Sequence, residues 1–236
     1  MSTAAGLRSD DRAALAELAP VLRRAVDLDA KALVRLRLGP DVATALVRLP
    51  FGVLISRSVR LDTAAQPRDG IVRDVATRAD ETLAWLDAPS DSTDPTDPNG
   101  PPAPRRRDAD WRYGLPPTSG WQRVETVPDD VVRPLVRSGA AALKDAAARE
   151  GVPGAKPRSE VADALLDAVV LTVSDDDAGA SAEISLRALS ALTRMGFLAR
   201  ESTMHVDVAG RWIRIVGSYG TVYLERPGAG LGMLSG

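Results

Sequence analysis

The sequence predicts an α+β fold, and two kinds of hydrophobic periodicity carry this prediction. In the stretches 32–61 and 204–225, apolar and polar residues alternate with a period of two, as in strands that bury one face. Elsewhere apolar residues recur three or four positions apart, the spacing of a helix that buries one side. Turn residues divide both alternating stretches into short strands, so we expect a three-stranded antiparallel meander in each half of the chain.

The N-terminal unit is expected to begin with a helix over 9–26. Ser9 and Asp10 can cap it, because their side-chain oxygens accept hydrogen bonds from the free N–H groups of the first turn. Apolar residues then follow at helical spacing, namely Leu15, Leu18, Leu22 and Val26. Pro20 lacks the N–H donor, which predicts a kink or two shorter helices.

Three strands and a second helix complete this unit. The strands are predicted at 32–38, 42–48 and 51–61. In the first strand, Arg35 and Arg37 alternate with apolar residues, so the two arginines are expected on the polar face. The helical spacing of apolar residues resumes over 70–87 and predicts a helix there.

Residues 88–107 are expected to form a disordered linker. Repeated prolines prevent regular hydrogen-bonded structure, and the aspartate, serine and threonine side chains between them favour water. The linker divides the chain into an N-terminal α+β unit, 1–87, and a C-terminal unit, 108–226. A flexible tail, 227–236, is expected to follow.

The segment 108–127 is expected to be irregular, and it concentrates the few aromatic residues of the chain. Trp111, Tyr113 and Trp121 lie within it, although aromatic residues make up only 4% of the sequence. They can pin a loop onto the core through their large apolar rings. They can also form a recognition surface that stacks on a ligand or a partner, and they are our candidate partner-binding residues.

Three helices and a second meander are expected in the C-terminal unit. The helices are predicted at 129–149, 159–172 and 182–195, with Gly196 placed to end the last one. The strands are predicted at 204–208, 212–216 and 221–225. The two meanders can form separate sheets or pair into one larger sheet, and the sequence leaves both arrangements open.

The composition excludes much common enzyme chemistry. The chain has no cysteine and a single histidine, His205, which removes thiolate catalysis, disulfides and cysteine-bound metals. His205 lies two positions before Asp207, and this pair reads either as a proton relay or as a surface histidine beside an acid. We therefore predict no cofactor and no metal site, and we name no catalytic residue.

Charge and hydropathy are ordinary for a globular protein. The net charge is −2 and the calculated isoelectric point is about 5.6, so the chain as a whole is not attracted to nucleic acid or to acidic membranes. No stretch has the length and apolarity of a signal peptide or a membrane span. We expect a cytoplasmic protein that makes no membrane contact.

The segment 186–198, which reads Leu-Arg-Ala-Leu-Ser-Ala-Leu-Thr-Arg-Met-Gly-Phe-Leu, is preceded by helices and followed by a hairpin. In this order of elements, 158–226 resembles the winged helix-turn-helix superfamily, whose recognition helix is followed by a two-stranded wing. The resemblance implies nucleic-acid binding. Two features depart from the family, because the link between the last two helices is about ten residues long and acidic, where a short turn is required.

Helical geometry places four polar residues, Glu183, Arg187, Ser190 and Arg194, on one exposed face. Arg187 and Arg194 could reach phosphates or a guanine edge, and Ser190 could contact a phosphate. Arg211 and Arg214 would lie on the hairpin. The candidate nucleic-acid-binding residues are thus Arg187, Ser190, Arg194, Arg211 and Arg214, and a solvated arginine face is the alternative interpretation.

The whole chain also resembles uncharacterised conserved proteins of high-GC actinobacteria. The stretches that carry this resemblance are Trp111-Arg-Tyr-Gly-Leu-Pro-Pro and Gly210-Arg-Trp-Ile-Arg-Ile. It implies no activity.

Three functions remain after these observations. The first is a non-catalytic cytoplasmic binding protein that acts through protein–protein contact, with a protein partner or a second copy of the chain. The second is a winged-helix protein that binds nucleic acid. The third is a carboxylate- or metal-dependent enzyme that uses His205 and Asp207.

Overall fold

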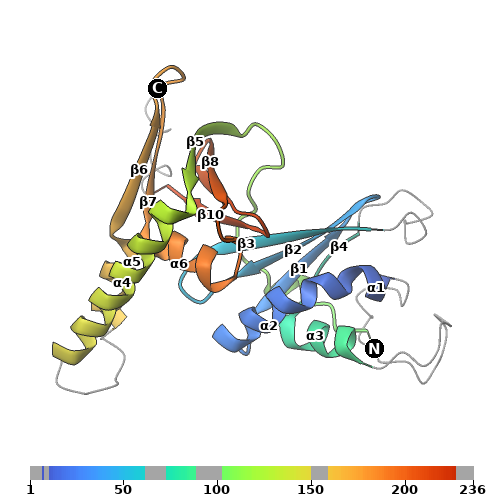
Figure 1. Cartoon of the computed structure of the whole chain (residues 1–236). Coiled ribbons are helices and arrows are strands. Elements are labelled where there is room, and N and C mark those ends of the chain that lie inside the picture. Colours follow the sequence, from blue (N-terminus) through green and yellow to red (C-terminus); the bar gives the residue numbers. More distant parts are fainter. Residues whose placement is uncertain (1–6, 8–10, 62–72, 89–102, 150–158, 227–236) are drawn as a thin grey trace, which may run out of the picture. The chain divides into compact units, whose positions relative to one another are not determined.

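The fold is α+β, as the sequence predicts, and it divides into two compact units, 1–114 and 115–236 (Figure 1). The computed structural model describes Leu7 and residues 11–61, 73–88, 103–149 and 159–226. Ser9 and Asp10, most of the expected linker 88–107 and the expected tail 227–236 lie outside the described residues. No described helix combines the length and apolarity needed to cross a membrane.

Unit 1 packs helices against one face of an antiparallel sheet whose strand order is β4-β1-β2-β3 (Figure 1). Its elements are α1 (Asp11–Leu15), a 3-10 turn (Ala16–Leu18), α2 (Ala19–Leu28), β1 (Leu33–Leu38), β2 (Val42–Arg48), β3 (Leu54–Arg60), β4 (Arg73–Arg78), α3 (Ala79–Asp87) and a second 3-10 turn (Asp108–Asp110). The predicted division into shorter helices is confirmed, because α1 and α2 are separated by a 3-10 turn. Pro20 lies in the first turn of α2, where a backbone N–H has no helical partner and its absence costs nothing.

The sheet of unit 1 has one apolar face and one polar face. Alternate residues of β1, namely Val34, Leu36 and Leu38, are buried, as are Leu18, Leu22 and Ala25 of the helical segment. Arg35 and Arg37 extend from the opposite face and are half-buried. The period of two in the sequence therefore identifies both faces of this strand correctly.

The expected helix over 70–87 is corrected by the structure. Residues Arg73–Arg78 form β4, which pairs with β1 over its whole length, and only Ala79–Asp87 form the helix α3. Val75 and Thr77 are buried from β4, and Ala79 and Thr82 are buried from α3. Buried residues of a strand and of the helix that follows it combine into a spacing that imitates one longer helix.

In unit 2, four antiparallel strands pair in the order β10-β9-β8-β5, and β6 and β7 form a separate two-stranded sheet. Its elements are β5 (Gln122–Pro128), α4 (Asp129–Arg149), α5 (Ser159–Asp167), β6 (Val169–Asp175), β7 (Ala180–Ser185), α6 (Leu186–Arg194), β8 (Thr203–Ala209), β9 (Trp212–Val216) and β10 (Thr221–Glu225). The three predicted strands of the second meander are confirmed as β8, β9 and β10.

Three further expectations for unit 2 are wrong. Residues 122–128, expected to be irregular, form β5, which pairs with β8 across a bulge. The expected helix over 159–172 ends at Asp167, and the expected helix over 182–195 begins only at Leu186. The residues between them form the hairpin β6–β7.

The core of unit 2 lies around α6. Leu186, Leu189 and Leu192 are buried on one side of this helix, and Phe197 is buried just after it. Gly196 has a φ of 68°, a left-handed conformation that glycine adopts freely, and it ends the helix as the sequence predicts.

Both units use the same strand arrangement with a different chain order. In each, a fourth strand pairs antiparallel with the first strand of the meander and leads directly into a helix, β4 into α3 and β5 into α4. The fourth strand follows the meander in unit 1 and precedes it in unit 2. Because the order is permuted, no repeat of fixed period is visible in the sequence.

Candidate binding surface

A buried carboxylate lies between two arginines on the polar face of the unit 2 sheet. Arg123 of β5 and Arg214 of β9 lie directly opposite Asp207 of β8 on its two sides. Arg123 Nε donates to Asp207 Oδ1 at 2.5 Å and Arg214 Nε donates to Oδ2 at 2.7 Å. The Asp207 side chain is 2% exposed, so both carboxylate oxygens are satisfied by charged donors rather than by water.

Trp121 covers one of these arginines. The Arg214 guanidinium carbon lies 4.4 Å from the centre of the Trp121 ring, and Tyr223 of β10, directly opposite Arg214, lies 6.1 Å from the same ring. The Trp121 indole N–H donates to the carbonyl oxygen of Pro117 at 2.9 Å. Trp121 is therefore half-buried and held in place by a cation–π contact.

Unit 1 carries a similar arrangement on its own polar face. Arg35 of β1 donates two hydrogen bonds to Asp74 of β4, at 2.7 and 3.0 Å, and Arg37 Nε lies 3.5 Å from the same carboxylate. The guanidinium of Arg35 also lies 5.9 Å from the centre of the Trp111 ring. In each unit, two arginines thus share one carboxylate, and a tryptophan covers one of the arginines.

Trp111 and Tyr113 cross this face together. Their rings meet edge to face at 5.6 Å, and the Trp111 indole N–H donates to the Tyr113 carbonyl oxygen at 3.1 Å. Trp111 is 8% exposed, whereas Tyr113 is 42% exposed and has the Arg48 guanidinium 4.9 Å from its ring centre. The Trp111 ring therefore holds this segment against the sheet, and Tyr113 is exposed to solvent.

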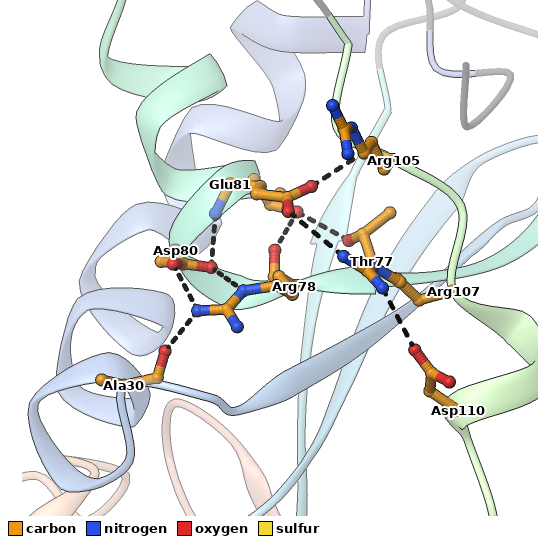
Figure 2. Close-up of polar contacts among 9 residues, drawn as sticks. Ala30, Thr77, Arg78, Asp80, Glu81, Arg105, Arg107 and Asp110 are labelled. Carbon is orange, nitrogen blue, oxygen red and sulfur yellow. Dashed lines mark hydrogen bonds and ion pairs between the residues drawn. The ribbon is translucent and has the colours of Figure 1, made fainter. Parts of the chain in front are cut away.

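The chain before Trp111 is tied to the edge of the sheet at β4 and α3. Ala76 N donates to Asp108 Oδ1 at 2.7 Å, and Arg107 N donates to the Ala76 carbonyl oxygen at 2.6 Å. Figure 2 shows Glu81 facing both Arg105 and Arg107, with Arg105 N donating to Glu81 Oε2 at 3.0 Å. The edge strand is therefore covered, and the aromatic segment enters the polar face at a fixed position.

An ion pair marks the start of α3. Arg78 donates two hydrogen bonds to Asp80, at 2.8 and 2.7 Å, and a third to the carbonyl oxygen of Ala30 at 2.8 Å (Figure 2). The Arg78 hydrogen bonds hold the pKa of Asp80 below its ordinary value, although partial burial acts in the opposite direction. Asp80 also lies in the first turn of α3, where the helix dipole favours a negative charge.

The candidate nucleic-acid-binding residues are divided between α6 and the β8–β9 hairpin. Arg187 is bound by Asp163 and Asp167 of α5, at 3.4 and 2.8 Å, and its side chain is 13% exposed. Ser190 is half-buried, and Arg194 is exposed. Glu183, expected on the same helix face, lies in β7.

The two hairpin arginines lie elsewhere. Arg211 is 3.8 Å from Glu225 and lies beside Trp212, while Arg214 extends from the polar face toward Asp207. The side of α6 that carries Leu189 is buried, and Ile213 and Ile215 next to Arg214 form the buried face of the sheet. Arg214 therefore does not share a surface with the arginines of α6. Between α5 and α6 the structure has the β6–β7 hairpin, not the short turn of a helix-turn-helix.

His205 and Asp207 do not form a proton relay with each other in the structure. His205 Nδ1 lies 3.0 Å from the hydroxyl of Thr126, whereas both oxygens of Asp207 accept from arginines. Among the described residues, no group of three or more histidine, aspartate or glutamate side chains is placed to hold a metal ion. What these clusters offer chemically is fixed positive charge beside aromatic rings.

Sequence reasoning did not select six residues of these clusters as functional, namely Arg35, Arg37, Arg48, Asp74, Arg123 and Tyr223. Arg35 carried a usable signal, because it alternates with buried residues in a predicted strand. Asp74 and Arg123 were hidden, because their strands were expected to be helical and irregular. Arg48 lies at the end of a strand and is distinguished only by the ring of Tyr113 above it.

Two families of unknown function match the sequence. Residues 2–106 match the family described as Domain of unknown function (DUF8010), and residues 116–229 match Domain of unknown function (DUF8185). No curated protein matches the chain in sequence.

The fold is similar to that of bacterial DNA polymerase sliding clamps. The Helicobacter pylori beta clamp in complex with diflunisal is matched at a TM-score of 0.53 and 11% identity, over 91% of this chain and 62% of that one. The DNA polymerase III subunit beta from Pseudomonas aeruginosa is matched at 0.51 and 12% identity, over 91% and 63%. The DNA polymerase beta subunit of Streptococcus pyogenes is matched at 0.51 and 10% identity, over 89% and 62%. This chain spans less than two thirds of those chains, and at these identities the likeness concerns the fold alone.

Proposed function

We propose that this chain is a non-catalytic binding protein that acts through protein–protein contact. Tyr113 and Arg48 lie at the centre of the proposed contact surface. A cytoplasmic location and a protein partner, or a second copy of the chain, belong to the same proposal. The interaction needs no cofactor and no membrane.

The observation that carries the proposal is the exposed ring of Tyr113 on a rigid support. Tyr113 is 42% exposed, although the Trp111 ring meets its ring at right angles and the Arg48 guanidinium lies over it. Tyrosine, tryptophan and arginine are the residues that most often dominate the energy of protein interfaces. A ring that is already fixed in the free protein loses little conformational entropy on binding, which favours affinity.

The fold comparisons give coarse support. By its name, the Pseudomonas aeruginosa protein is a subunit of a DNA polymerase, and so works within a protein assembly. A chain with a similar fold is suited to a comparable binding role.

The experiment is quantitative co-purification from the source cells with three tagged forms of the full chain. These are the wild type, Tyr113→Ala and Tyr219→Ala. Tyr219 is a matched control because its side chain is also strongly exposed, at 52%, and it lies in unit 2. Far-ultraviolet circular dichroism and sedimentation velocity would establish that each form is folded and whether it self-associates.

We expect at least one protein, or the self-associated form, to be retained by the wild type and Tyr219→Ala and reduced at least tenfold with Tyr113→Ala. Equal retention of every protein by all three folded forms, with unchanged self-association, would contradict the proposed surface.

A further inference from the structure

We propose that the polar face of the unit 1 sheet binds an extended acidic segment of the partner protein. This inference rests on the proposed function and specifies the chemistry of the partner. The surface, here called the arginine face, consists of Arg37, Thr44, Arg48, Ser58 and Arg60. It begins beside Tyr113 and runs along β2 and its two neighbours.

The strand register places these residues on one surface. Arg37 of β1 lies directly opposite Thr44 of β2, which lies directly opposite Ser58 of β3. Arg48 is four residues further along β2, and Arg60 is two residues beyond Ser58, opposite Val42. Because every second residue of a strand points to the same side, all five side chains project from the polar face.

The charges on this face are strongly unequal, although the whole chain carries a net charge of −2. Among the strand residues of β1 to β4 that project from the polar face, Asp74 is the single acidic residue. Arg35 occupies both oxygens of Asp74 at 2.7 and 3.0 Å. Arg37 lies at 3.5 Å from that carboxylate, too far for a strong hydrogen bond, and can turn toward a ligand.

The remaining groups suit carboxylates and peptide backbone. The guanidinium group of arginine presents parallel N–H donors that fit a carboxylate at two points. Thr44 and Ser58 lie between the arginines with their hydroxyl groups 2.9 Å apart in an exposed hydrogen bond, and they can donate to or accept from a peptide. Val42, 43% exposed beside Arg60, adds an apolar contact.

The length of the surface indicates an extended ligand. Arg60 lies opposite Val42, which is six residues before Arg48 on β2, and six strand residues correspond to about 20 Å. An extended peptide of about six residues covers this distance. Acidic side chains at the two ends and near the middle would then meet Arg48, Arg60 and Arg37.

The charge distribution favours an acidic peptide over nucleic acid. Nucleic-acid affinity grows with the number of phosphates neutralised, and it is opposed by acids around the site. Asp41 lies at the end of this face next to Val42, and Asp108, which accepts a hydrogen bond from Ala76 N, lies at its β4 edge. A short peptide needs only the local arginines, so the flanking acids oppose it less and help to fix its position.

The test is fluorescence anisotropy with the full-length chain and three labelled probes. The probes are hexaglutamate, hexaglutamine and hexathymidylate, each at 50 and 300 mM NaCl. The main variant is Arg37→Gln/Arg48→Gln/Arg60→Gln. Its matched control is Arg137→Gln/Arg194→Gln/Arg200→Gln, which removes the same charge from exposed arginines of unit 2.

We expect the wild type and the control to bind hexaglutamate with equal affinity, and more tightly than either other probe. The arginine-face variant should bind it at least tenfold more weakly, and 300 mM salt should weaken binding to the wild type. Ser58→Glu is a second variant at an exposed position, and the added carboxylate should reduce hexaglutamate binding at least threefold.

Four outcomes would overturn the inference. They are no measurable hexaglutamate binding, equal loss in both triple variants, equal binding of hexaglutamine, and tighter binding of hexathymidylate, which would indicate a nucleic-acid surface. The proposed function is judged separately by Tyr113→Ala co-purification. A partner that depends on Tyr113 but is retained by the arginine-face variant would leave the protein-binding function intact and reject its acidic ligand.

Discussion

Asp207 and Arg214 lie directly opposite each other on β8 and β9, and Arg214 Nε donates to the buried carboxylate at 2.7 Å. Arg123 approaches the same carboxylate from β5 on the other side at 2.5 Å. Arg123, Asp207 and Arg214 therefore form a row of alternating charge across the neighbouring strands β5, β8 and β9. The arrangement joins the edge strand β5 to the meander by charge as well as by backbone hydrogen bonds.

Asp207→Ala should lower the free energy of unfolding by about 2 kcal/mol. Removing one partner of a fully buried ion pair costs more, but Arg123 and Arg214 are 51% and 28% exposed and can turn toward water. Urea denaturation followed by tryptophan fluorescence would measure the change. Asp163→Ala removes an acid that is 60% exposed and should cost less than about 1 kcal/mol. Equal losses of unfolding free energy for the two substitutions would show that the buried Asp207 contributes no more to stability than an exposed ion pair.

Alanine substitutions of Trp111 and Tyr113 should differ in their effect on stability, because only Trp111 is buried. Trp111 is 8% exposed, so Trp111→Ala should lower the free energy of unfolding by about 3 kcal/mol. Tyr113 is 42% exposed, and Tyr113→Ala should cost less than about 1 kcal/mol because mainly the contact with Arg48 is lost. Thermal and urea unfolding would measure both. A large loss of stability in Tyr113→Ala would mean that this ring supports the fold rather than a contact surface.

Gly217 should not tolerate alanine. A Cβ atom there would lie 2.5 Å from the carbonyl oxygen of Phe197, a backbone atom that cannot move without disturbing the core. Gly217→Ala should therefore cost more than about 2 kcal/mol of unfolding free energy. Gly210→Ala is the comparison, because its φ is 53° but nothing lies within 4 Å of the added atom. It should cost about 1 kcal/mol, from backbone strain alone, and the reverse ranking in urea denaturation would be evidence against the packing around Phe197.

Asp80 should contribute to the acid sensitivity of unit 1. The Arg78 hydrogen bonds lower its pKa in the folded state, so the folded protein favours the ionised form more than the unfolded chain does. This contribution is complete above the unfolded pKa of about 4 and is lost as the pH falls through the lower folded value. Because the Asp80 side chain is 41% exposed, Asp80→Asn should cost no more than about 1 kcal/mol at pH 7.

Unfolding by urea at pH 7 and at pH 2.5 would measure this effect. The difference between wild type and Asp80→Asn should be smaller at the lower pH, because the folded pKa of Asp80 is lowered and its charge is lost only as the pH falls through it. Asp87→Asn changes the charge at the opposite end of α3. The loss of the exposed ion pair with Arg23 there opposes the relief of an acid disfavoured by the helix dipole, so this substitution should be close to neutral at pH 7. A difference for Asp80→Asn that is equally large at both pH values would mean that the amide disturbs packing rather than charge.

Much of the fold could be predicted, and the failures have one physical origin. The bulge between Arg123 and Glu125 moves the buried residues of β5, Val124 and Val127, to a spacing of three, which removes the strand signal. In β4, Val75 continues the helical spacing of the buried residues of α3, so the pattern predicts one longer helix. In both strands the local pattern points away from the structure, and pairing with a distant strand decides the outcome.

The candidate site was less predictable than the fold. Trp111, Tyr113 and Trp121 could be selected because aromatic residues are rare in this chain. Their separate roles could not, because exposure depends on what folds against each ring. The sequence predicts Arg214 as a nucleic-acid contact, whereas the structure places it between the Asp207 carboxylate and the Trp121 ring.

The sequence by itself determined the α+β class, the two meanders and the end of α6 at Gly196, because these depend on local periodicity and on the conformational freedom of one residue. Only the tertiary structure decided which strands join β1 and β8, which carboxylate each arginine holds, and that Tyr113 is presented while Trp111 is buried. Those features depend on contacts between residues far apart in the chain, such as Arg123 with Asp207 and Arg35 with Asp74. Local patterns of hydrophobicity and charge do not encode such pairings.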